Sequence, residues 1–158
     1  MNYDNIIFDF DGVIAESNEV KTNAFYELYQ RYGAEIAKKV VNHHMMNEGL
    51  SRFEKFKHYH KNFLNKNISN SELKSMSIEF SNFVVKKVID SNEVKGVGNF
   101  LKKYYKRLNL YIVTATPEFE IEYILEKRKL TSFFIDVKGS PKSKTMNIES
   151  LISTYFWI

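Results

Sequence analysis

Apolar residues follow two different periods along the chain, and the alternation between these periods outlines the fold. Runs of nearly consecutive apolar residues are typical of strands buried on both faces, and they occur at 5–9, 110–114 and 133–137. Elsewhere apolar residues recur every third or fourth position, as on the buried face of a helix. This second pattern predicts helices at about 20–33, 34–46, 51–64, 69–88, 97–104 and 116–129, and from 143 onward.

Local sequence signals place several helix ends. Gly33 is suited to the C-terminus of the first helix, and Ser69 with Glu72 fits a capping box at the start of the fourth. Thr116 followed by Pro117 predicts a helix start, with Thr116 as the N-cap and Pro117 in the first turn.

The order of these elements predicts an α/β fold. Strands alternate with helices, which implies a Rossmann-like parallel sheet with right-handed crossovers. The helices that follow the first strand form an insertion in this sheet. We therefore predict an α/β core from residues 1–16 and 94–158, and a helical cap from residues 17–93.

The composition is that of an ordinary globular protein. The chain has 158 residues, of which 44% are hydrophobic and 27% charged, enough for a core domain with an insertion. It has no cysteine, which excludes disulfides and thiolate metal sites. The first residues lack the regions of a signal peptide, and no apolar run approaches the ~20 residues of a membrane span. We expect a cytoplasmic protein with no membrane partner.

The net charge of +4 and the pI of about 9.1 favour an anionic partner. That partner is a nucleic acid or a phosphorylated metabolite; alternatively, the charge belongs to solvated helix faces. The lysines stand in scattered pairs such as Lys38-Lys39 and Lys102-Lys103, and no nucleic-acid-binding motif accompanies them. We therefore expect no nucleic-acid partner. The sequence indicates no particular oligomeric state.

Polar and charged residues follow all three predicted strands. Asp9 and Asp11 follow the first, Thr114 ends the second, and Lys142 and Lys144 follow the third. The carboxyl ends of parallel strands form the ligand-binding edge of an open α/β sheet, so these residues can converge. One carboxylate can attack phosphorus, the other can act as general acid and base, and a hydroxyl and a lysine can hold phosphoryl oxygens. Two carboxylates beside a phosphate require a hard cation such as Mg²⁺.

Each of these residues also has an interpretation without chemistry. Asp9 and Asp11 can form an acidic turn, Thr114 can be an ordinary β-branched strand residue, and Lys144 can be a solvated lysine at a helix start. Their joint occurrence at three strand ends favours the functional interpretation of the acidic pair.

The segment Phe8–Ile14 resembles the first motif, D-x-D-G-[VT], of the haloacid dehalogenase (HAD) superfamily. Thr114, at the end of 111–114, resembles the second motif, and Lys144, in 139–144, resembles the third. Order and spacing agree over nearly the whole chain. The helical insertion is similar to the cap of the phosphoglycolate phosphatase and β-phosphoglucomutase group.

This resemblance implies a Mg²⁺-dependent phosphomonoester hydrolase that acts on a small phosphorylated metabolite through an aspartyl-phosphate intermediate. Asp9 would be the nucleophile and a metal ligand, and Asp11 the general acid/base with its main-chain carbonyl on the metal. Thr114 would bind the transferring phosphoryl group. Lys144, with Lys142 as the alternative, would pair with Asp9 and the phosphate. The dehalogenase branch lacks an acid at the position of Asp11, which favours phosphoryl transfer.

The resemblance stops before the family's fourth motif, an acidic pair that completes the Mg²⁺ site. After Lys144 the only acidic residue is Glu149, which lies in the last predicted helix. We expect this polypeptide to bind Mg²⁺ weakly and to have little phosphatase activity, as a truncated product or fragment would. A phosphosugar mutase and a non-catalytic remnant that retains the fold are the alternatives.

Two features of the helical insertion bear on ligands. Arg52 lies where related caps recognise the leaving group, and it is a candidate contact for an anionic substrate; the alternative is a surface arginine at a helix start. The four histidines, His43-His44 with His58 and His60, are adjacent or two residues apart. Such spacings do not share a helical face, so we predict no zinc site.

Overall fold

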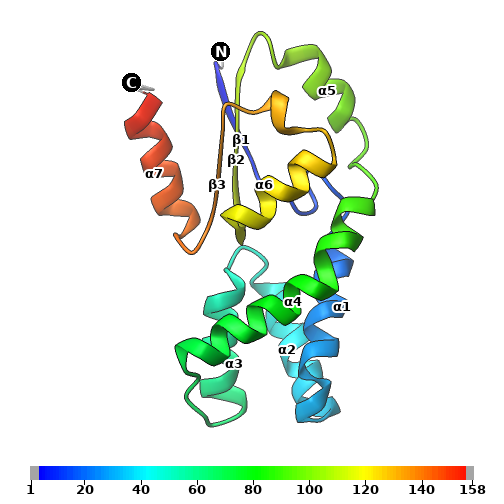
Figure 1. Cartoon of the computed structure of the whole chain (residues 1–158), viewed down its shortest axis with the longest axis vertical. Coiled ribbons are helices and arrows are strands. Elements are labelled where there is room, and N and C mark those ends of the chain that lie inside the picture. The colour runs from blue at the N-terminus through cyan, green and yellow to red at the C-terminus, as the bar shows by residue number, and fades with distance from the viewer. Residues whose placement is uncertain (1–3, 156–158) are drawn as a thin grey trace. The chain divides into compact units, whose positions relative to one another are not determined.

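A computed structural model of the chain describes residues 4–155 and divides into two compact units (Figure 1). One unit consists of Met1–Glu16 and Ile89–Ile158 and contains the sheet. The other, Ser17–Val88, is helical. Within residues 4–155, no helix is both long enough and apolar enough to cross a bilayer.

The sheet has three parallel strands in the order β1-β2-β3. Their bounds are Asn5–Phe8 for β1, Asn109–Pro117 for β2 and Asp136–Ser140 for β3. Phe8 lies beside Ile112, and Val113 beside Lys138, so the carboxyl ends of all three strands meet at one edge. The prediction of an α/β fold with a parallel sheet is confirmed.

Helices cover both faces of this sheet. They are α5, Val97–Tyr104; α6, Glu118–Lys127; and α7, Lys144–Tyr155. On one face, Leu151 of α7 packs against Tyr111 of β2. On the other face, Phe8 makes edge-to-face contacts with Phe100 of α5 and with Phe134, at ring-centroid distances of 5.9 and 6.2 Å. The strands thus lie between α7 and the pair α5 and α6 (Figure 1).

The predicted position of the third strand, 133–137, is wrong by three residues. Thr131–Phe133 forms a short 3-10 helix, η2, and β3 begins at Asp136. The aromatic residues that suggested a strand are engaged elsewhere, because Phe133 packs edge-to-face on Tyr105 at 5.2 Å. Side-chain packing between helices and loops therefore overrides the local strand pattern.

The predicted cap of α6 is also wrong. Thr116 belongs to β2, and Pro117 is both the last residue of β2 and the N-cap of α6. A register shift after Val113 lets Pro117 pair with Ser140. β2 consequently continues past Thr114. The Thr116 hydroxyl does not cap α6 but donates to the Asp11 carboxylate.

The four helices of the inserted unit begin and end near their predicted positions. They are α1, Asn18–Tyr29, continued by the 3-10 helix η1, Gln30–Tyr32; α2, Ala34–Met46; α3, Arg52–Phe63; and α4, Asn70–Asp90. Ser69 and Glu72 form the predicted capping box: the Ser69 N–H donates to Glu72 Oε2 (2.8 Å), and the Glu72 N–H donates to Ser69 Oγ (3.3 Å). Phe25 and Phe80, with ring centroids 4.5 Å apart, lie in the aromatic core of this unit.

His43 of α2 has polar and aromatic neighbours on α3. Its ring stacks on His58 at 4.1 Å, and its Nδ1 lies 3.3 Å from the Tyr59 hydroxyl. Burial, together with the charges of His58 and Lys55, lowers the pKa of His43. The folded chain therefore takes up a proton at His43 at lower pH than the unfolded chain, whose histidines titrate near their ordinary pKa of about 6.5.

We expect His43 to make the stability of the helical unit fall on acidification. As the pH drops below about 6.5, the unfolded state binds a proton that the folded state does not, which favours unfolding until the pKa of folded His43 is reached. Urea unfolding monitored by circular dichroism between pH 7.5 and 5.5 measures this loss. In His43→Gln the loss should be smaller, and an equally steep loss in that variant would contradict the assignment.

Candidate active site

Asp9 and Asp11 lie in a tight loop directly after β1. The loop is closed by main-chain bonds, among them the Gly12 N–H, which donates to the carbonyl of Ala15 at 2.8 Å. Gly12 has a φ of 71°, a left-handed conformation that glycine adopts at little cost. The loop therefore holds both carboxylates just beyond the carboxyl edge of the sheet.

The Asp9 carboxylate is held at both oxygens. Nζ of Lys144, the first residue of α7, lies 2.5 Å from Asp9 Oδ2, and the main-chain N–H of Phe10 donates to Oδ1 at 2.8 Å. The side chains of Asp9 and Lys144 are 36% and 30% exposed. The carboxylate is thus oriented beside a cation while it remains open to a ligand.

The structure brings Lys144, the first of the two lysine candidates, to Asp9. Ser143 precedes α7, and its Oγ accepts a hydrogen bond from the N–H of Met146 at 3.2 Å. α7 therefore begins at Lys144, at the edge of the sheet where Asp9 lies. Lys142 is exposed in the turn between β3 and α7.

Two threonines of β2 lie at the same edge. Thr114 and Thr116 are both buried, and Thr114 Oγ1 accepts a hydrogen bond from the N–H of Thr116 at 3.3 Å. The Thr116 hydroxyl donates to Asp11 Oδ2, also at 3.3 Å. Thr116 is thus a site residue that the predicted helix cap concealed. Its spacing of two from Thr114, which is the period of a strand, is the signal that could have identified it.

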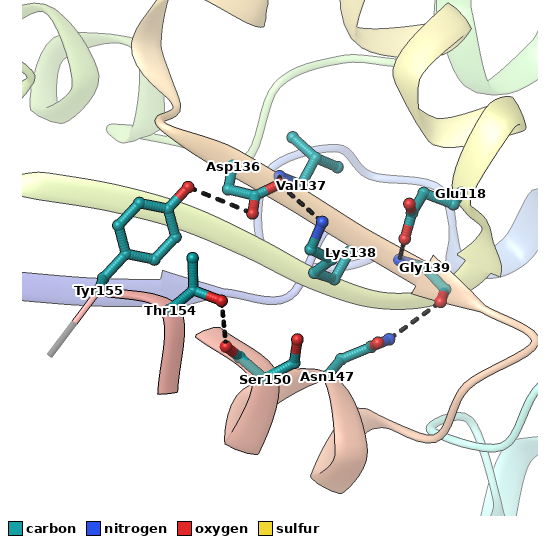
Figure 2. Close-up of polar contacts among 9 residues, drawn as sticks. All are labelled: Glu118, Asp136, Val137, Lys138, Gly139, Asn147, Ser150, Thr154 and Tyr155. Carbon is teal, nitrogen blue, oxygen red and sulfur yellow. Dashed lines mark hydrogen bonds and ion pairs between the residues drawn. The ribbon is translucent and has the colours of Figure 1, made fainter. Parts of the chain in front are cut away.

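The end of β3 is fixed from two sides around Gly139 (Figure 2). Its N–H donates to Glu118 Oε2 at 3.0 Å, and its carbonyl accepts from Asn147 Nδ2 at 2.9 Å. Asn147 is buried and follows Lys144 on α7 by three residues, so its side chain ties the helix that carries Lys144 to the sheet edge. Sequence patterns did not predict Glu118 and Asn147 as site residues. The helical spacing from Lys144 to Asn147 is the only signal for the latter.

We expect Asn147→Ala to lower the free energy of unfolding by about 1–3 kcal/mol, because it leaves the buried Gly139 carbonyl without this donor. Glu149→Ala, an exposed change on the same helix, should stay within about 0.5 kcal/mol of the wild type. Urea unfolding of both variants measures the difference. Equal stability of the two variants would show that the bond to Gly139 contributes nothing.

Arg52 lies inside the helical unit. It is the first residue of α3, and only 5% of it is exposed. Its guanidinium donates to the Ser77 carbonyl (3.3 Å) and to Ser81 Oγ (2.7 Å), and it lies 4.6 Å from the centroid of the Phe80 ring. The interpretation as a surface arginine is therefore wrong. Contact of Arg52 with an anionic substrate stays a prediction.

The oxygen donors of Asp9 and Asp11 suit a hard cation such as Mg²⁺. Among residues 4–155, no three Asp, Glu or His side chains gather as a metal-binding group. Glu149 is exposed on α7. Glu118 is a further acid at the carboxyl edge of the sheet, where its Oε2 accepts the N–H of Gly139.

The sequence matches a protein-family model described as haloacid dehalogenase-like hydrolase over residues 6–147. This range includes Asp9, Asp11, Thr114 and Lys144. Among curated proteins, no sequence matches significantly.

Solved structures with this fold include phosphatases and a mutase. A predicted phosphatase from Clostridium acetobutylicum has a TM-score of 0.71 and 19% identity, over 98% of this chain and 71% of its own. A predicted phosphoglycolate phosphatase from Haemophilus somnus has a TM-score of 0.68 and 17% identity, over 97% of this chain and 72% of its own. For β-phosphoglucomutase from Clostridium difficile the values are 0.68 and 21%, over 90% of this chain and 64% of its own. At such identities these matches establish the fold.

Proposed function

The chain belongs to the haloacid dehalogenase-like hydrolases, and we propose that it is a cytoplasmic, Mg²⁺-dependent phosphomonoester hydrolase that acts on a small phosphorylated metabolite. The contact between Lys144 and Asp9 carries this proposal, because it joins residues 135 positions apart at the carboxyl edge of the sheet. A partly exposed carboxylate beside a cation suits attack on an anionic phosphate. Asp11, the second acid, supports phosphoryl transfer.

The reaction proceeds in two steps. In the first, an Asp9 carboxylate oxygen attacks phosphorus, and the bond from phosphorus to the leaving oxygen breaks as protonated Asp11 gives that oxygen its proton. In the second, the Asp11 carboxylate takes a proton from water, whose oxygen attacks phosphorus. The bond between phosphorus and Asp9 then breaks, which releases inorganic phosphate.

The neighbouring residues orient these two acids. The Phe10 N–H and Lys144 fix the Asp9 carboxylate, and Lys144 also balances negative charge on the phosphoryl oxygens. The Thr116 hydroxyl holds Asp11 on one oxygen. Thr114 is the proposed hydroxyl contact for the transferring group, and Arg52 the proposed contact for an anionic part of the substrate.

Asp9, through its carboxylate, and Asp11, through its main-chain carbonyl, would hold Mg²⁺. When bound, the ion neutralises charge between the carboxylates and the phosphate. Among residues 4–155, no third Asp, Glu or His side chain gathers with these two acids as a metal-binding group. We therefore propose that the 158-residue polypeptide binds Mg²⁺ weakly and turns over slowly.

Hydrolysis of p-nitrophenyl phosphate by the purified polypeptide tests the proposal. We expect slow release of p-nitrophenol that requires Mg²⁺, rises without saturation over the physiological Mg²⁺ range, and stops when EDTA removes the metal. Hydrolysis that is indifferent to EDTA would contradict the proposed metal dependence, and tight saturation by Mg²⁺ would contradict the proposed weak metal site.

The small number of metal-binding carboxylates also favours a second candidate, a non-catalytic member of the family that retains the fold and binds a phosphate compound. The same assay separates the two candidates. A folded polypeptide that binds inorganic phosphate, as measured by calorimetry, but releases no p-nitrophenol at any Mg²⁺ concentration would support this second candidate.

A further inference from the structure

Thr116 contacts two groups of the candidate site: Thr114, the proposed hydroxyl contact for the phosphoryl group, and Asp11, the proposed acid and base. Its main-chain N–H donates to Thr114 Oγ1, and its hydroxyl donates to Asp11 Oδ2, each at 3.3 Å. Both distances are long for hydrogen bonds, but bonds of this kind in catalytic sites often tighten when substrate binds. One residue of β2 thus joins the hydroxyl and the acid of the site.

The packing of β2 on β3 fixes the main chain of Thr116. Only 2% of Thr116 is exposed, and its carbonyl oxygen would lie 2.5 Å from a β-carbon at Gly139. The next residue, Pro117, pairs with Ser140. The side chain of a threonine is branched at its β-carbon, which restricts its rotation. The position of the hydroxyl is therefore set by the sheet, and not by the loop that carries Asp11.

The bond from Thr116 restricts the orientation of the Asp11 carboxyl group. Oδ2 accepts the hydroxyl, and it can do so both when the carboxyl group is ionised and when a proton is bound to Oδ1. The same contact can therefore persist while Asp11 gives up a proton and takes one back. It favours Oδ1 as the oxygen that carries the proton, because a proton on Oδ2 would compete with the hydroxyl.

The main-chain N–H of Thr116 has a corresponding effect on Thr114. A hydroxyl has one hydrogen to donate and two lone pairs to accept with. Because Thr114 Oγ1 already accepts the Thr116 N–H, its own hydrogen is directed elsewhere. Phosphoryl oxygens are acceptors, so this orientation suits the proposed contact of Thr114 with the transferring group.

We propose that Thr116 is a positioning residue for proton transfer, and this inference rests on the proposed function. Its hydroxyl orients the Asp11 carboxyl group so that the proton is carried on Oδ1. In the first step this proton moves to the leaving oxygen as the bond from phosphorus to that oxygen breaks. In the second step a proton of the attacking water moves to Oδ1. Thr116 itself exchanges no proton with the substrate.

Two esters of similar shape test this role, because they differ in their need for a proton on the leaving oxygen. p-Nitrophenolate leaves readily without one, whereas phenolate is a stronger base and depends more on a general acid. The value of kcat/KM reports the step in which this group leaves. We expect Thr116→Val to lower kcat/KM about tenfold or more for phenyl phosphate, but less than about threefold for p-nitrophenyl phosphate.

Two further variants control for structural effects of the substitution. Thr116→Ser keeps the hydroxyl and should recover most of the activity toward phenyl phosphate. Thr131→Val makes the same change at an exposed threonine and should alter neither value of kcat/KM.

A double-mutant cycle tests the contact between Thr116 and Asp11 without any measurement of activity. The hydroxyl has this carboxylate to bind in the wild type but not in Asp11→Ala. Thr116→Val should therefore lower the urea midpoint of unfolding more in the wild-type background than in the Asp11→Ala background. A wild-type chain that hydrolyses neither ester would contradict the proposed function, and the cycle would still decide whether the contact exists.

Three results would overturn the proposal. One is an equal fall in kcat/KM for both esters in a folded Thr116→Val chain, which would instead indicate a role in substrate binding. Another is a Thr116→Ser variant as impaired toward phenyl phosphate as Thr116→Val. The third is strict additivity in the double-mutant cycle, which would mean that the two side chains do not interact.

Discussion

We expect replacement of Asp9 by asparagine to lower Mg²⁺-dependent hydrolysis of p-nitrophenyl phosphate to the uncatalysed rate. The amide that replaces the carboxylate is too weak a nucleophile to form the acyl phosphate, and losses of about three orders of magnitude or more are typical when a covalent nucleophile is removed. The change preserves size. It breaks only a partly exposed pair with Lys144, so the free energy of unfolding should change by roughly 0–1 kcal/mol.

Asp4→Asn is the matched control for this experiment. Asp4 is an exposed aspartate that precedes β1, and only its main-chain carbonyl takes part in the sheet, as the acceptor for Asn109. We expect its activity and unfolding midpoint to equal those of the wild type. If Asp9→Asn retains the activity of Asp4→Asn, Asp9 is not the nucleophile.

Replacement of Gly139 by alanine should lower the free energy of unfolding. A β-carbon added at Gly139 would lie 2.5 Å from the carbonyl oxygen of Thr116 and 2.6 Å from the main-chain nitrogen of Glu118. These are main-chain atoms, which cannot swing aside as the end of a side chain can. Gly139→Ala therefore pushes the end of β3 away from the turn between β2 and α6. We expect a loss of about 1–3 kcal/mol or more in the free energy of unfolding.

Gly49→Ala isolates the effect of the close approach from the general effect of losing a glycine. A β-carbon at Gly49 meets nothing within 4 Å, so this variant should stay within about 0.5 kcal/mol of the wild type. Urea unfolding of both variants by circular dichroism gives the comparison. If Gly139→Ala has wild-type stability, the main chain at the end of β3 can shift without cost. Its bonds to Glu118 and Asn147 would then not fix its position.

Periodicity and capping signals predicted the helices of the inserted unit well, because each of these helices carries an apolar stripe and a recognisable end. Ser69 with Glu72 marks the start of α4 in the sequence and caps it in the structure. β1 and most of β2 were equally predictable, since they are short apolar runs; those residues are half-buried in β1 and mostly buried in β2.

The third strand could not be placed from local sequence. Phe133 and Phe134 look like strand residues, but they pack on Tyr105 and Phe8, which are distant in sequence. β3 instead runs from Asp136 to Ser140 and includes Gly139, which has no strand preference and stands where the approach of Thr116 leaves no room for a side chain. Tertiary packing decides both positions.

The candidate site was only partly predictable. Topology places the strand ends at a common edge, and the resemblance to the family's motifs selected Asp9 and, ahead of Lys142, Lys144; these two residues are in contact in the structure. The supporting residues Thr116, Glu118 and Asn147 act through single hydrogen bonds to particular atoms. Neither their residue types nor their spacing specify those bonds.

Chemical trapping shows whether Asp9 carries the phosphoryl group during the reaction. The folded polypeptide is mixed with p-nitrophenyl phosphate and Mg²⁺ and quenched in acid, and borohydride then reduces any aspartyl phosphate to homoserine, which mass spectrometry locates in the chain. We predict homoserine at position 9 and nowhere else, and none when Mg²⁺ is withheld. A phosphoryl group on any other residue, or hydrolysis without homoserine at position 9, would contradict the account.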